Sequence, residues 1–488
     1  MAKKNYKRGQ KVGTWTLKKY LGGGGNGEVW QCTNSKGEHG AIKLLKAVRP
    51  KSYARFRDEI IVIEKNSDVK GIIPILDKNL PEDLGTETPY YVMPIAQSAE
   101  QLLNGKSIEY KVDAILQVCE TLKELHNRKI AHRDIKPPNL LFYNSNYSLA
   151  DFGLVDYPEK QDISLKNEEI GAKWTLAPEM RRESSNADGL KADVYSLAKT
   201  LWIVLTEKKK GFDGQYSSGS ILDLGGFFPQ VYTAPLDKLL SSSTDNDPKV
   251  RPTIDDFIFT LKKWKSLNEN FHERNLQQWF EVQQKLFPAG FPKRVIWEDL
   301  DDIINVLRIV CSYDNLNHMF FPDGGGLDLL DVRLSAEEGC LELDFELIDI
   351  VKPKRLIFES FGYDPEWNYF RLELDELSPW ANNDTVEESE AKQSQSLTQV
   401  YPGVYEDYDF LDTSYHHAAD DPDYERPEGM IHVSRWLRGT FVIFNKRSTY
   451  NLNSQTYDGR HNKMDTEEFR NYIQRNVNIF RRKEMSII

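Results

Sequence analysis

Cysteine is scarce in this sequence. Only four occur among 488 residues, and none belongs to a C-x-x-C pair. They are Cys32, Cys119, Cys311 and Cys340. Single cysteines at such wide spacing argue against a disulfide framework and against a cysteine-based zinc site. We therefore expect a protein of a reducing compartment, the cytoplasm.

Long apolar runs and an excess of positive charge are also missing. No stretch approaches the ~18 apolar residues that a membrane-spanning helix needs. The basic residues 1–8 are followed by no apolar segment, so they do not resemble a signal peptide. The net charge of −12 argues against a general surface for nucleic acid or anionic lipid, and the basic run from Arg475 to Lys483 is interpreted as a solvated helix end. We expect no membrane span and no nucleic-acid partner.

The chain is rich enough in apolar residues to fold into more than one domain. Hydrophobic residues make up 40% of the 488 positions, which is ample for buried cores. A chain of this length suits two or three domains.

The segment from Ala131 to Asn139, AHRDIKPPN, carries the strongest chemical signal. Asp134 can accept the proton of a substrate hydroxyl, Lys136 can neutralise charge on a moving phosphoryl group, and Asn139 can hold a metal ion. All three lie on one short loop, which is what phosphoryl transfer to a hydroxyl requires.

Four further motifs lie at compatible distances. A G-x-G-x-x-G-x-V pattern at Gly22, Gly24, Gly27 and Val29 lies between two strand-like runs, so its backbone N–H groups could close over phosphates. The other three are Ala41-Ile42-Lys43, Asp151-Phe152-Gly153 and Ala177-Pro178-Glu179. A lone glycine pattern is weak evidence, but five motifs in this order are very specific.

Together these motifs resemble the eukaryotic-type, or Hanks-type, serine/threonine protein kinase family over roughly residues 10–266. The resemblance implies ATP and Mg²⁺ as cofactors, with Mn²⁺ as an alternative metal, and protein substrates. It implies catalytic roles for Asp134, Lys136, Lys43 and Glu59, and metal-binding roles for Asn139 and Asp151. Glu64 is the rival of Glu59 as the ion-pair partner of Lys43.

The nucleotide site implied by the resemblance uses backbone groups and apolar side chains. Its expected members are Leu21, Gly22, Gly24, Gly27, Val29, Ala41, Lys43, Met93, Ile95, Ala96 and Leu141. Met93 would guard the rear of the adenine pocket, and the hinge of residues 94–96 would bond the adenine edge through its backbone. Pro94 replaces a commoner Glu in this hinge and removes one backbone donor.

Other matches to the family are structural. Asp193 resembles the Asp that braces the catalytic loop, and Glu179 with Arg251 resembles a buried ion pair of the lower lobe. Ile63, His132 and Phe152 resemble members of the apolar stack that aligns the lobes; their interpretation is core, not chemistry.

The type of hydroxyl accepted and the competence of the site also follow from the resemblance. Lys136 is the serine/threonine form of its position, although dual specificity stays open. A pseudokinase is disfavoured because Lys43, Asp134, Asn139 and Asp151 are all kept.

The segment before Ala177 departs from the family. Gly171-Ala172 replaces a usual Gly-Thr, so either Thr175 or a water takes over the missing hydroxyl bond, or the local alignment shifts. Residues 157–170 are acidic, with Glu159, Asp162, Glu168 and Glu169. These acids could mimic a phosphate and pair with Arg133, or the segment could be a solvated loop with Ser164 as a candidate phosphorylation site.

The second half carries no catalytic constellation that we recognise. Helical spacing continues to Phe287, and a further helix is expected over residues 298–311. Alternating apolar residues predict one strand over residues 341–350, others at residues 355–361, 369–374 and 440–444, and a final helix over residues 466–481. His416 and His417 would point apart on a strand and are interpreted as solvated.

We therefore predict an α+β protein with a bilobal kinase fold, β-rich above and helical below, and an α+β accessory domain with an antiparallel meander. The expected limits are residues 1–10 for a basic tail, 11–266 for the kinase domain, 267–297 for a helical linker and 298–488 for the accessory domain. A mobile acidic insertion is expected near residues 382–428.

Two functions remain open. One is an ATP-dependent serine/threonine protein kinase regulated by its C-terminal domain, in stress signalling or bacteriophage defence, with self-association for autophosphorylation. The alternative is a nucleotide-binding or autophosphorylating switch or scaffold that acts through the C-terminal domain.

Overall fold

The computed structural model divides into two compact units, Met1–Glu269 (unit 1) and Asn270–Ile488 (unit 2). The described residues are 6–23, 27–46, 49–82, 87–158, 174–182, 187–313, 315–322, 325–362, 365–377, 396–401, 404–406, 433–445 and 464–485. Each unit is described by itself.

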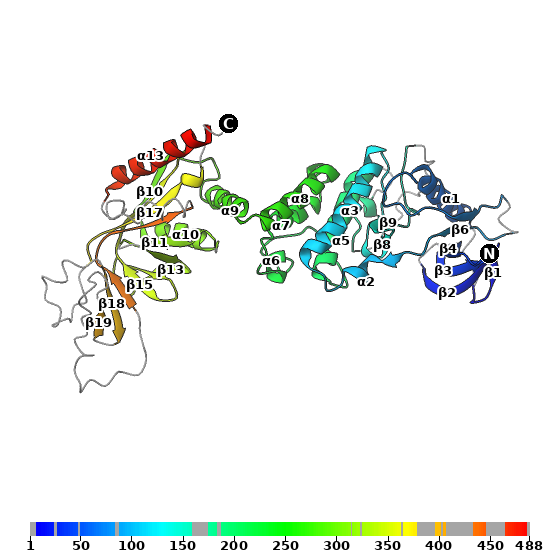
Figure 1. The fold of residues 1–488 in the computed structure, drawn as a ribbon, viewed down its shortest axis with the longest axis horizontal. Coiled ribbons are helices and arrows are strands. Elements are labelled where there is room, and N and C mark those ends of the chain that lie inside the picture. The colour runs from blue at the N-terminus through cyan, green and yellow to red at the C-terminus, as the bar shows by residue number, and fades with distance from the viewer. Residues whose placement is uncertain are drawn as a thin grey trace. The chain divides into compact units, whose positions relative to one another are not determined.

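Unit 1 consists of a β-rich N-terminal lobe and a mainly helical C-terminal lobe, which lie side by side in Figure 1. They are called the upper and the lower lobe below. The upper lobe contains β1 (Lys11–Val12), β2 (Trp15–Gly23), β3 (Gly27–Asn34), β4 (His39–Leu45), α1 (Pro50–Lys65), β5 (Asp77–Asn79) and β6 (Tyr90–Met93). The lower lobe contains β7 (Gln97–Ser98), α2 (Ala99–Leu103), α3 (Ile108–Asn127), β8 (Leu140–Tyr143), β9 (Asn146–Leu149), α4 (Pro178–Arg182), α5 (Gly189–Thr206), α6 (Leu224–Phe227), α7 (Ala234–Ser243) and α8 (Ile254–Glu269).

The upper lobe is an antiparallel sheet with one helix packed against it. Its strand order is β1-β2-β3-β4-β6-β5. Helix α1 begins at Pro50, whose fixed φ suits the first helical turn. Phe56, Ile60 and Ile63 recur at helical spacing and are buried in the core of unit 1. With these residues in the core, the side of α1 that carries Glu59 faces β4, where Glu59 contacts Lys43.

The lower lobe is built around long helices that lie side by side. Helix α3 packs against α5 and α8 (Figure 1). Ser107 caps α3 by accepting a hydrogen bond from the Tyr110 N–H, and Asp188 caps α5 through the N–H groups of Leu190 and Lys191. The strands β7, β8 and β9 form a small sheet of their own. The loop of residues 131–139 directly precedes β8, so the core of this lobe fixes its position.

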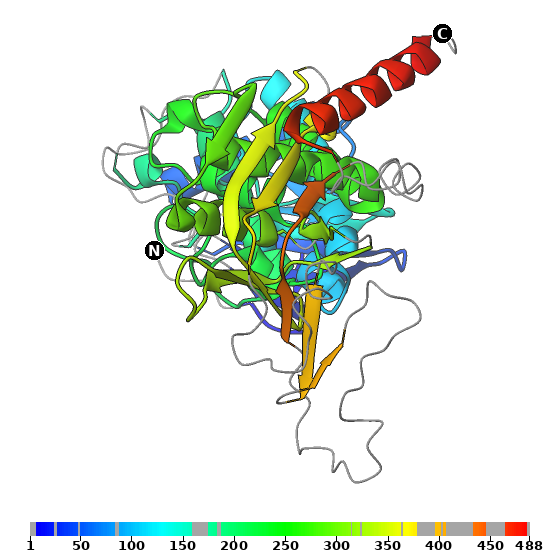
Figure 2. The ribbon, with the colours of Figure 1, turned by 90° about the vertical axis from the view of Figure 1, so that its left-hand side faces the viewer.

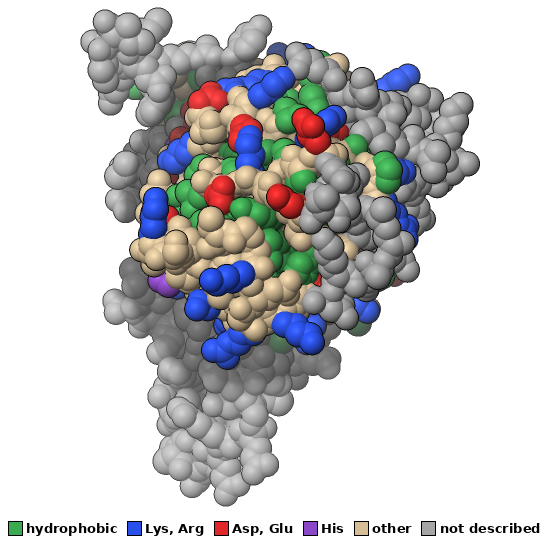
Figure 3. All heavy atoms as spheres, turned by 90° about the vertical axis from the view of Figure 1, so that its right-hand side faces the viewer, with side chains coloured by type: hydrophobic (Ala, Val, Ile, Leu, Met, Phe, Trp, Pro, Cys, Tyr) green, Lys and Arg blue, Asp and Glu red, His purple; other side chains and the backbone are tan. Residues whose placement is uncertain are grey.

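The outer face of unit 1 shown in Figure 3 carries charges of both signs. Lys and Arg side chains lie around its edge, Asp and Glu side chains lie in its upper and middle part, and hydrophobic side chains are visible between them. The lower part of the described face shows mainly Lys and Arg side chains.

Unit 2 is a mixture of strands and helices. Its first sheet contains β10 (Arg294–Trp297), β16 (Pro353–Glu359), β17 (Tyr369–Leu374), β21 (Thr440–Phe444), β11 (His318–Phe320) and β12 (Gly326–Asp328), in this spatial order. Its second sheet contains β13 (Asp331–Leu334), β14 (Leu341–Asp344), β15 (Ile348–Val351), β20 (Val433–Trp436), β18 (Ser396–Tyr401) and β19 (Val404–Glu406). The helices are α9 (Phe271–Leu286), α10 (Leu300–Cys311) and α13 (Thr466–Met485).

The first sheet of unit 2 is covered on both faces. Alternation along β17 sends Phe370 and Leu372 into a core shared with α9 and α10. Tyr369, one residue earlier, faces the other way and packs against Phe469 of α13. Figure 2 shows α13 beside this sheet. The α+β class and the antiparallel sheets predicted from the sequence are confirmed.

Two expectations for this half need correction. The range 267–297 is expected to be a linker, yet Trp279 and Val282 of α9 are fully buried in the core of unit 2. The range 341–350 is expected to be one strand, yet it forms the hairpin β14–β15. Glu346 adopts a left-handed φ of 73° at the turn, which ends the first strand in spite of continued alternation.

Most of the expected acidic insertion lies outside the described residues, as do His416 and His417. Among the described residues, no helix is long and apolar enough to span a membrane.

Candidate active site

A cleft of ≈ 1210 Å³ in unit 1 collects nearly all of the predicted site residues. Its lining includes Leu21, Gly22, Gly27, Val29, Ala41, Lys43, Glu59, Met93, Ala96, Asp134, Lys136, Asn139, Leu141 and Asp151. Gly24 lies outside the described residues. Ile95 is not part of the lining, and 42% of its surface is exposed. The resemblance implied that Ile95 bonds the adenine edge through its backbone. That role does not require its side chain to face the cleft.

The upper wall of the cleft carries a buried ion pair. The Lys43 Nζ atom on β4 lies 2.6 and 2.9 Å from the two carboxylate oxygens of Glu59 on α1. It also lies 2.8 Å from Asp151 Oδ1. Glu64, the rival partner, instead pairs with Lys78, and both side chains are over 40% exposed. Glu59 is therefore the partner of Lys43 in this structure.

One member of this group was missed by the sequence analysis. The buried Tyr91 hydroxyl on β6 donates a hydrogen bond of 2.9 Å to Glu59 Oε1. No alternation in the sequence marks it, because β6 is Tyr-Tyr-Val-Met and its first three residues are all buried. In the structure Tyr91 lies opposite Lys43, its cross-strand neighbour on β4.

Mutual attraction keeps Lys43 and Asp151 charged. Lys43 is the main cause that lowers the pKa of Asp151 to about 2. Burial would lower the pKa of Lys43, but the attraction of Glu59, assisted by Asp151, holds it well above its usual value. Asp151 is therefore ionised across the physiological pH range and is suited to hold a divalent cation.

The lower wall holds the groups of the loop of residues 131–139. Asp134 is 7% exposed, and its Oδ2 atom accepts hydrogen bonds from Lys136 Nζ at 2.7 Å and from Asn139 Nδ2 at 3.0 Å. Within the described residues its other oxygen, Oδ1, is buried without a hydrogen-bond partner. Burial raises the pKa of Asp134, while Lys136 opposes this shift. Asp134 lines the cleft, and one oxygen of its carboxylate is left without a hydrogen-bond donor among the described residues.

The donor set fits a nucleotide with a divalent cation. Asn139 and Asp151 present an amide and a carboxylate, oxygen ligands of the kind that Mg²⁺ prefers. Lys43 supplies a fixed positive charge beside them, and the glycines of β2 and β3 leave the roof of the cleft open to phosphates. The free acceptor of Asp134 is suited to a hydroxyl rather than to a phosphate.

Comparison with known proteins decides the family. A family model for the protein kinase domain matches residues 15–260, about half of the chain. The chain belongs to the protein kinase family. The serine/threonine protein kinase resemblance predicted from the motifs is thereby confirmed.

The relatives of this kinase share about 30% of its residues over the catalytic domain. A protein of Acanthamoeba polyphaga mimivirus, described as a serine/threonine-protein kinase, is 28% identical over 212 residues, which are 40% of this chain and 76% of the relative. Calcium-dependent protein kinase 3 of Plasmodium yoelii yoelii is 30% identical over 195 residues, 38% of this chain and 35% of the relative.

A relative of the other hydroxyl class is the human tyrosine-protein kinase FRK. It is 28% identical over 283 residues, 53% of each chain. This kinase thus spans only about half of FRK and a third of the Plasmodium relative, and all of these matches are to proteins named as kinases.

The catalytic loop of the kinase is braced from below by Asp193 at the start of α5. This fully buried carboxylate accepts hydrogen bonds of 2.7 Å from the backbone N–H groups of His132 and Arg133. It also lies 3.1 Å from His126 Nε2. The His132 ring packs on Phe152, with centroids 4.8 Å apart, and Phe152 and Ile63 lie in the shared core of the two lobes. These contacts explain the structural roles expected for the residues.

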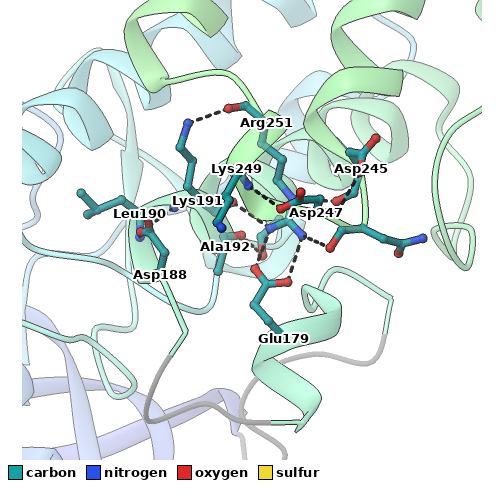
Figure 4. A network of polar contacts seen from close by, with 11 residues as sticks. Glu179, Asp188, Leu190, Lys191, Ala192, Asp245, Asp247, Lys249 and Arg251 are labelled. Atoms are coloured by element: carbon teal, nitrogen blue, oxygen red, sulfur yellow. Dashed lines mark hydrogen bonds and ion pairs between the residues drawn. The ribbon is translucent and has the colours of Figure 1, made fainter.

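A second ion pair holds α4 in the lower lobe of the kinase. Arg251, with a fully buried side chain, donates to both carboxylate oxygens of Glu179 at 2.6 and 2.9 Å. It also donates to the backbone oxygens of Asp245 and Lys191 (Figure 4). The same arginine therefore connects three segments that are distant in sequence.

The segment from Asp151 to Glu179 is called the activation segment below. Only some of the residues at which it departs from the family are described. Gly171, Ala172, Ser164 and the acids Glu159, Asp162, Glu168 and Glu169 lie outside the described residues. Thr175 is buried, and within the described residues no hydrogen bond joins it to Asp134 or Lys136. The Asp134 bonds of this structure come from Lys136 and Asn139 instead.

Proposed function

We propose that this chain is an ATP- and Mg²⁺-dependent kinase that transfers the γ-phosphoryl group of ATP to serine and threonine hydroxyls of proteins. The observation that carries the proposal is the arrangement of Asp134. Asp134 lines the cleft. One of its oxygens is bonded to Lys136 and Asn139, and the other is buried without a hydrogen-bond partner among the described residues.

Asp134 would act on the nucleophile. Its Oδ1 atom accepts the hydrogen bond of an entering hydroxyl, orients it, and takes its proton as the bond to phosphorus forms. Lys136 stays bonded to Oδ2, so that its positive charge is held close to the position of the moving phosphoryl group. Most of the rate gain then comes from positioning and from charge stabilisation.

Lys43, Asn139 and Asp151 would act on the nucleotide. Mg²⁺, when bound by Asn139 and Asp151, supplies neutralisation of phosphate charge. Lys43 would contact the phosphates, with its position fixed by Glu59 and by the Tyr91 hydroxyl behind it. Leu21, Val29, Ala41 and Leu141 would enclose the adenine between apolar walls.

The serine/threonine preference rests on Lys136 and on those relatives that are named as serine/threonine kinases, among them the mimivirus protein. We also propose that unit 2 regulates the kinase, because it has cores of its own and we recognise no catalytic constellation among its described residues. Stress signalling or bacteriophage defence, self-association for autophosphorylation and a cytoplasmic location are further parts of this proposal. The four free cysteines support only the cytoplasmic location.

The test is phosphoryl transfer by the purified full chain with labelled ATP and Mg²⁺. Peptides that differ only in a central Ser, Thr or Tyr serve as acceptors, and mass spectrometry locates every phosphate. We expect transfer to Ser and Thr, and loss of about 10²–10⁴-fold in rate for Asp134→Asn because the proton acceptor is removed. Asp255→Asn is the matched control, since Asp255 is 58% exposed and pairs only at the surface with Lys123.

A further inference from the structure

Arg133, the neighbour of the catalytic Asp134, is held in one position. Its backbone adopts a left-handed φ of 64°, and its N–H is bonded to Asp193. Its side chain is only 9% exposed. A Cβ atom added at Gly189 would meet Arg133 Nε at 3.1 Å, so the first residue of α5 packs closely against the guanidinium group. A cation fixed in this way requires an anionic partner.

Asp156 of the chain itself supplies that partner. Its carboxylate forms an ion pair with the Arg133 guanidinium. Its backbone forms an antiparallel bridge with Ala131, with N–H···O bonds of 2.9 and 2.8 Å. The start of the activation segment, five residues after Asp151, is thereby joined to the catalytic loop by main chain and side chain together.

Tyr157, the next residue, reaches the upper lobe. Its hydroxyl donates a hydrogen bond of 3.1 Å to Asp58 Oδ1 on α1. Asp58 is 7% exposed and directly precedes Glu59, which holds Lys43. Two consecutive residues therefore connect the segment after Asp151 to the catalytic loop on one side and to α1 on the other.

Kinases generally order this region by phosphorylation, which supplies an anion to arginine side chains. Here a carboxylate already neutralises Arg133 while Lys43 and Glu59 are in contact. We propose that Asp156 and Tyr157 form a latch that keeps the catalytic loop and α1 in their working positions, so that activity does not require a phosphate on the activation segment. This inference rests on the proposed kinase function and names positioning residues, not catalytic ones.

The test begins with the full chain after treatment with a phosphatase that acts on Ser, Thr and Tyr. Intact mass confirms that no phosphate remains, and initial rates give kcat and KM for ATP and a peptide. The latch predicts that dephosphorylated wild type keeps about half or more of its kcat. A kcat that falls about tenfold after dephosphorylation and recovers after autophosphorylation would overturn the latch.

The variants Asp156→Asn and Tyr157→Phe test the two contacts separately. We expect Asp156→Asn to lower kcat by about tenfold or more, with a change in the KM for ATP of less than about threefold, because alignment rather than binding is lost. Asp156→Glu should restore most of kcat, and Tyr157→Phe should lower it by about threefold or more. Equal kcat values for Asp156→Asn and the control Asp255→Asn would contradict the latch.

A second measurement separates the latch from the proposed function. Amide hydrogen exchange reports local opening without any turnover. If wild type transfers no phosphate in any state, the kinase proposal fails, and exchange alone decides on the latch. Faster exchange in α1 and in residues 131–135 for Asp156→Asn and Tyr157→Phe than for Asp255→Asn supports it. Unchanged exchange refutes it, and unfolding curves of each variant show whether the fold is kept.

Discussion

At the residue scale, the burial of Asp134 and its contact with Lys136 together set the acid limit of the expected activity. Burial raises the pKa of Asp134 above the ordinary value of about 3.9, and Lys136 is the main cause that opposes the shift. The active form is the carboxylate, so activity falls as the pH falls through this pKa. The raised pKa places that fall at a higher pH than an ordinary aspartate would.

Removing the charge of Lys136 should therefore move the acid limit further upward. For Lys136→Met we expect the acid limb of kcat to shift to higher pH, in addition to a lower plateau. Lys136→Arg keeps the charge and should leave the limb in place. The measurement is kcat against pH at saturating ATP and Mg²⁺. An acid limb that is the same in wild type and Lys136→Met would show that another group controls it.

Where a motif fixes the spacing, the sequence indicated which residues the structure brings together. Asp134, Lys136 and Asn139 lie on one loop, so their proximity followed directly from their spacing. Residues that contact the site from other elements belong to no motif with a fixed spacing. Tyr91 and Tyr157 touch their partners across 32 and 99 positions of sequence, and only folding brings them together.

At the scale of elements, Arg251 shows how one side chain fixes a short helix. Helix α4 has only five residues and is too short to be stable by itself. Its Glu179 is held by Arg251, which also bonds the backbone near residues 191 and 245. The position of α4 therefore depends on a buried charge pair, and so does the segment that leads to it.

Loss of this arginine should destabilise the lower lobe. Arg251→Met leaves Glu179 and three backbone oxygens without their donor, and we expect a loss of about 3–5 kcal/mol in the free energy of unfolding. The control is Lys262→Met, whose exposed pair with Glu120 should contribute less than about 1 kcal/mol. Calorimetric unfolding of both variants gives the comparison, and equal effects would contradict the structural role of Arg251.

Turns and pairings between distant strands were harder to predict than helices, for a physical reason. The spacing of apolar residues located α10 within two residues at its start, because Asp299 caps it and a helix is a local structure. A turn needs only one residue with a left-handed φ, and Glu346 gave no glycine or proline to announce it. The parallel pair β15–β20 joins segments over 80 positions apart and could not be read from alternation.

At the scale of the whole molecule, each unit has its own apolar core. In unit 1, one core cluster extends from Leu45 and Phe56 to Trp264. In unit 2, Trp279 belongs to one cluster and Phe469 to another. The sequence analysis expected two domains but placed residues 267–297 between them, because the amphipathic pattern of α9 does not show which core it faces.

Separate cores predict separate unfolding transitions. Phe469 is fully buried against Tyr369, and Phe469→Ala should cost about 3–5 kcal/mol in one transition. Ile479→Ala on the same helix is the control, since Ile479 is 52% exposed. In calorimetry, Phe469→Ala and Arg251→Met should move different transitions, and ATP with Mg²⁺ should raise only the one that Arg251→Met lowers. A single transition moved by both variants would contradict independent cores.

The central claim is that Asp134 carries phosphoryl transfer from ATP to serine and threonine, and one comparison tests it most directly. Wild type and Asp134→Asn are incubated in parallel with labelled ATP and Mg²⁺, and the phosphate on Ser, Thr and Tyr is quantified. The account predicts phosphate on Ser and Thr with wild type and almost none with Asp134→Asn, although both proteins bind ATP. Equal transfer by the two proteins, or ATP binding without any transfer by wild type, would contradict it and favour a nucleotide-dependent scaffold.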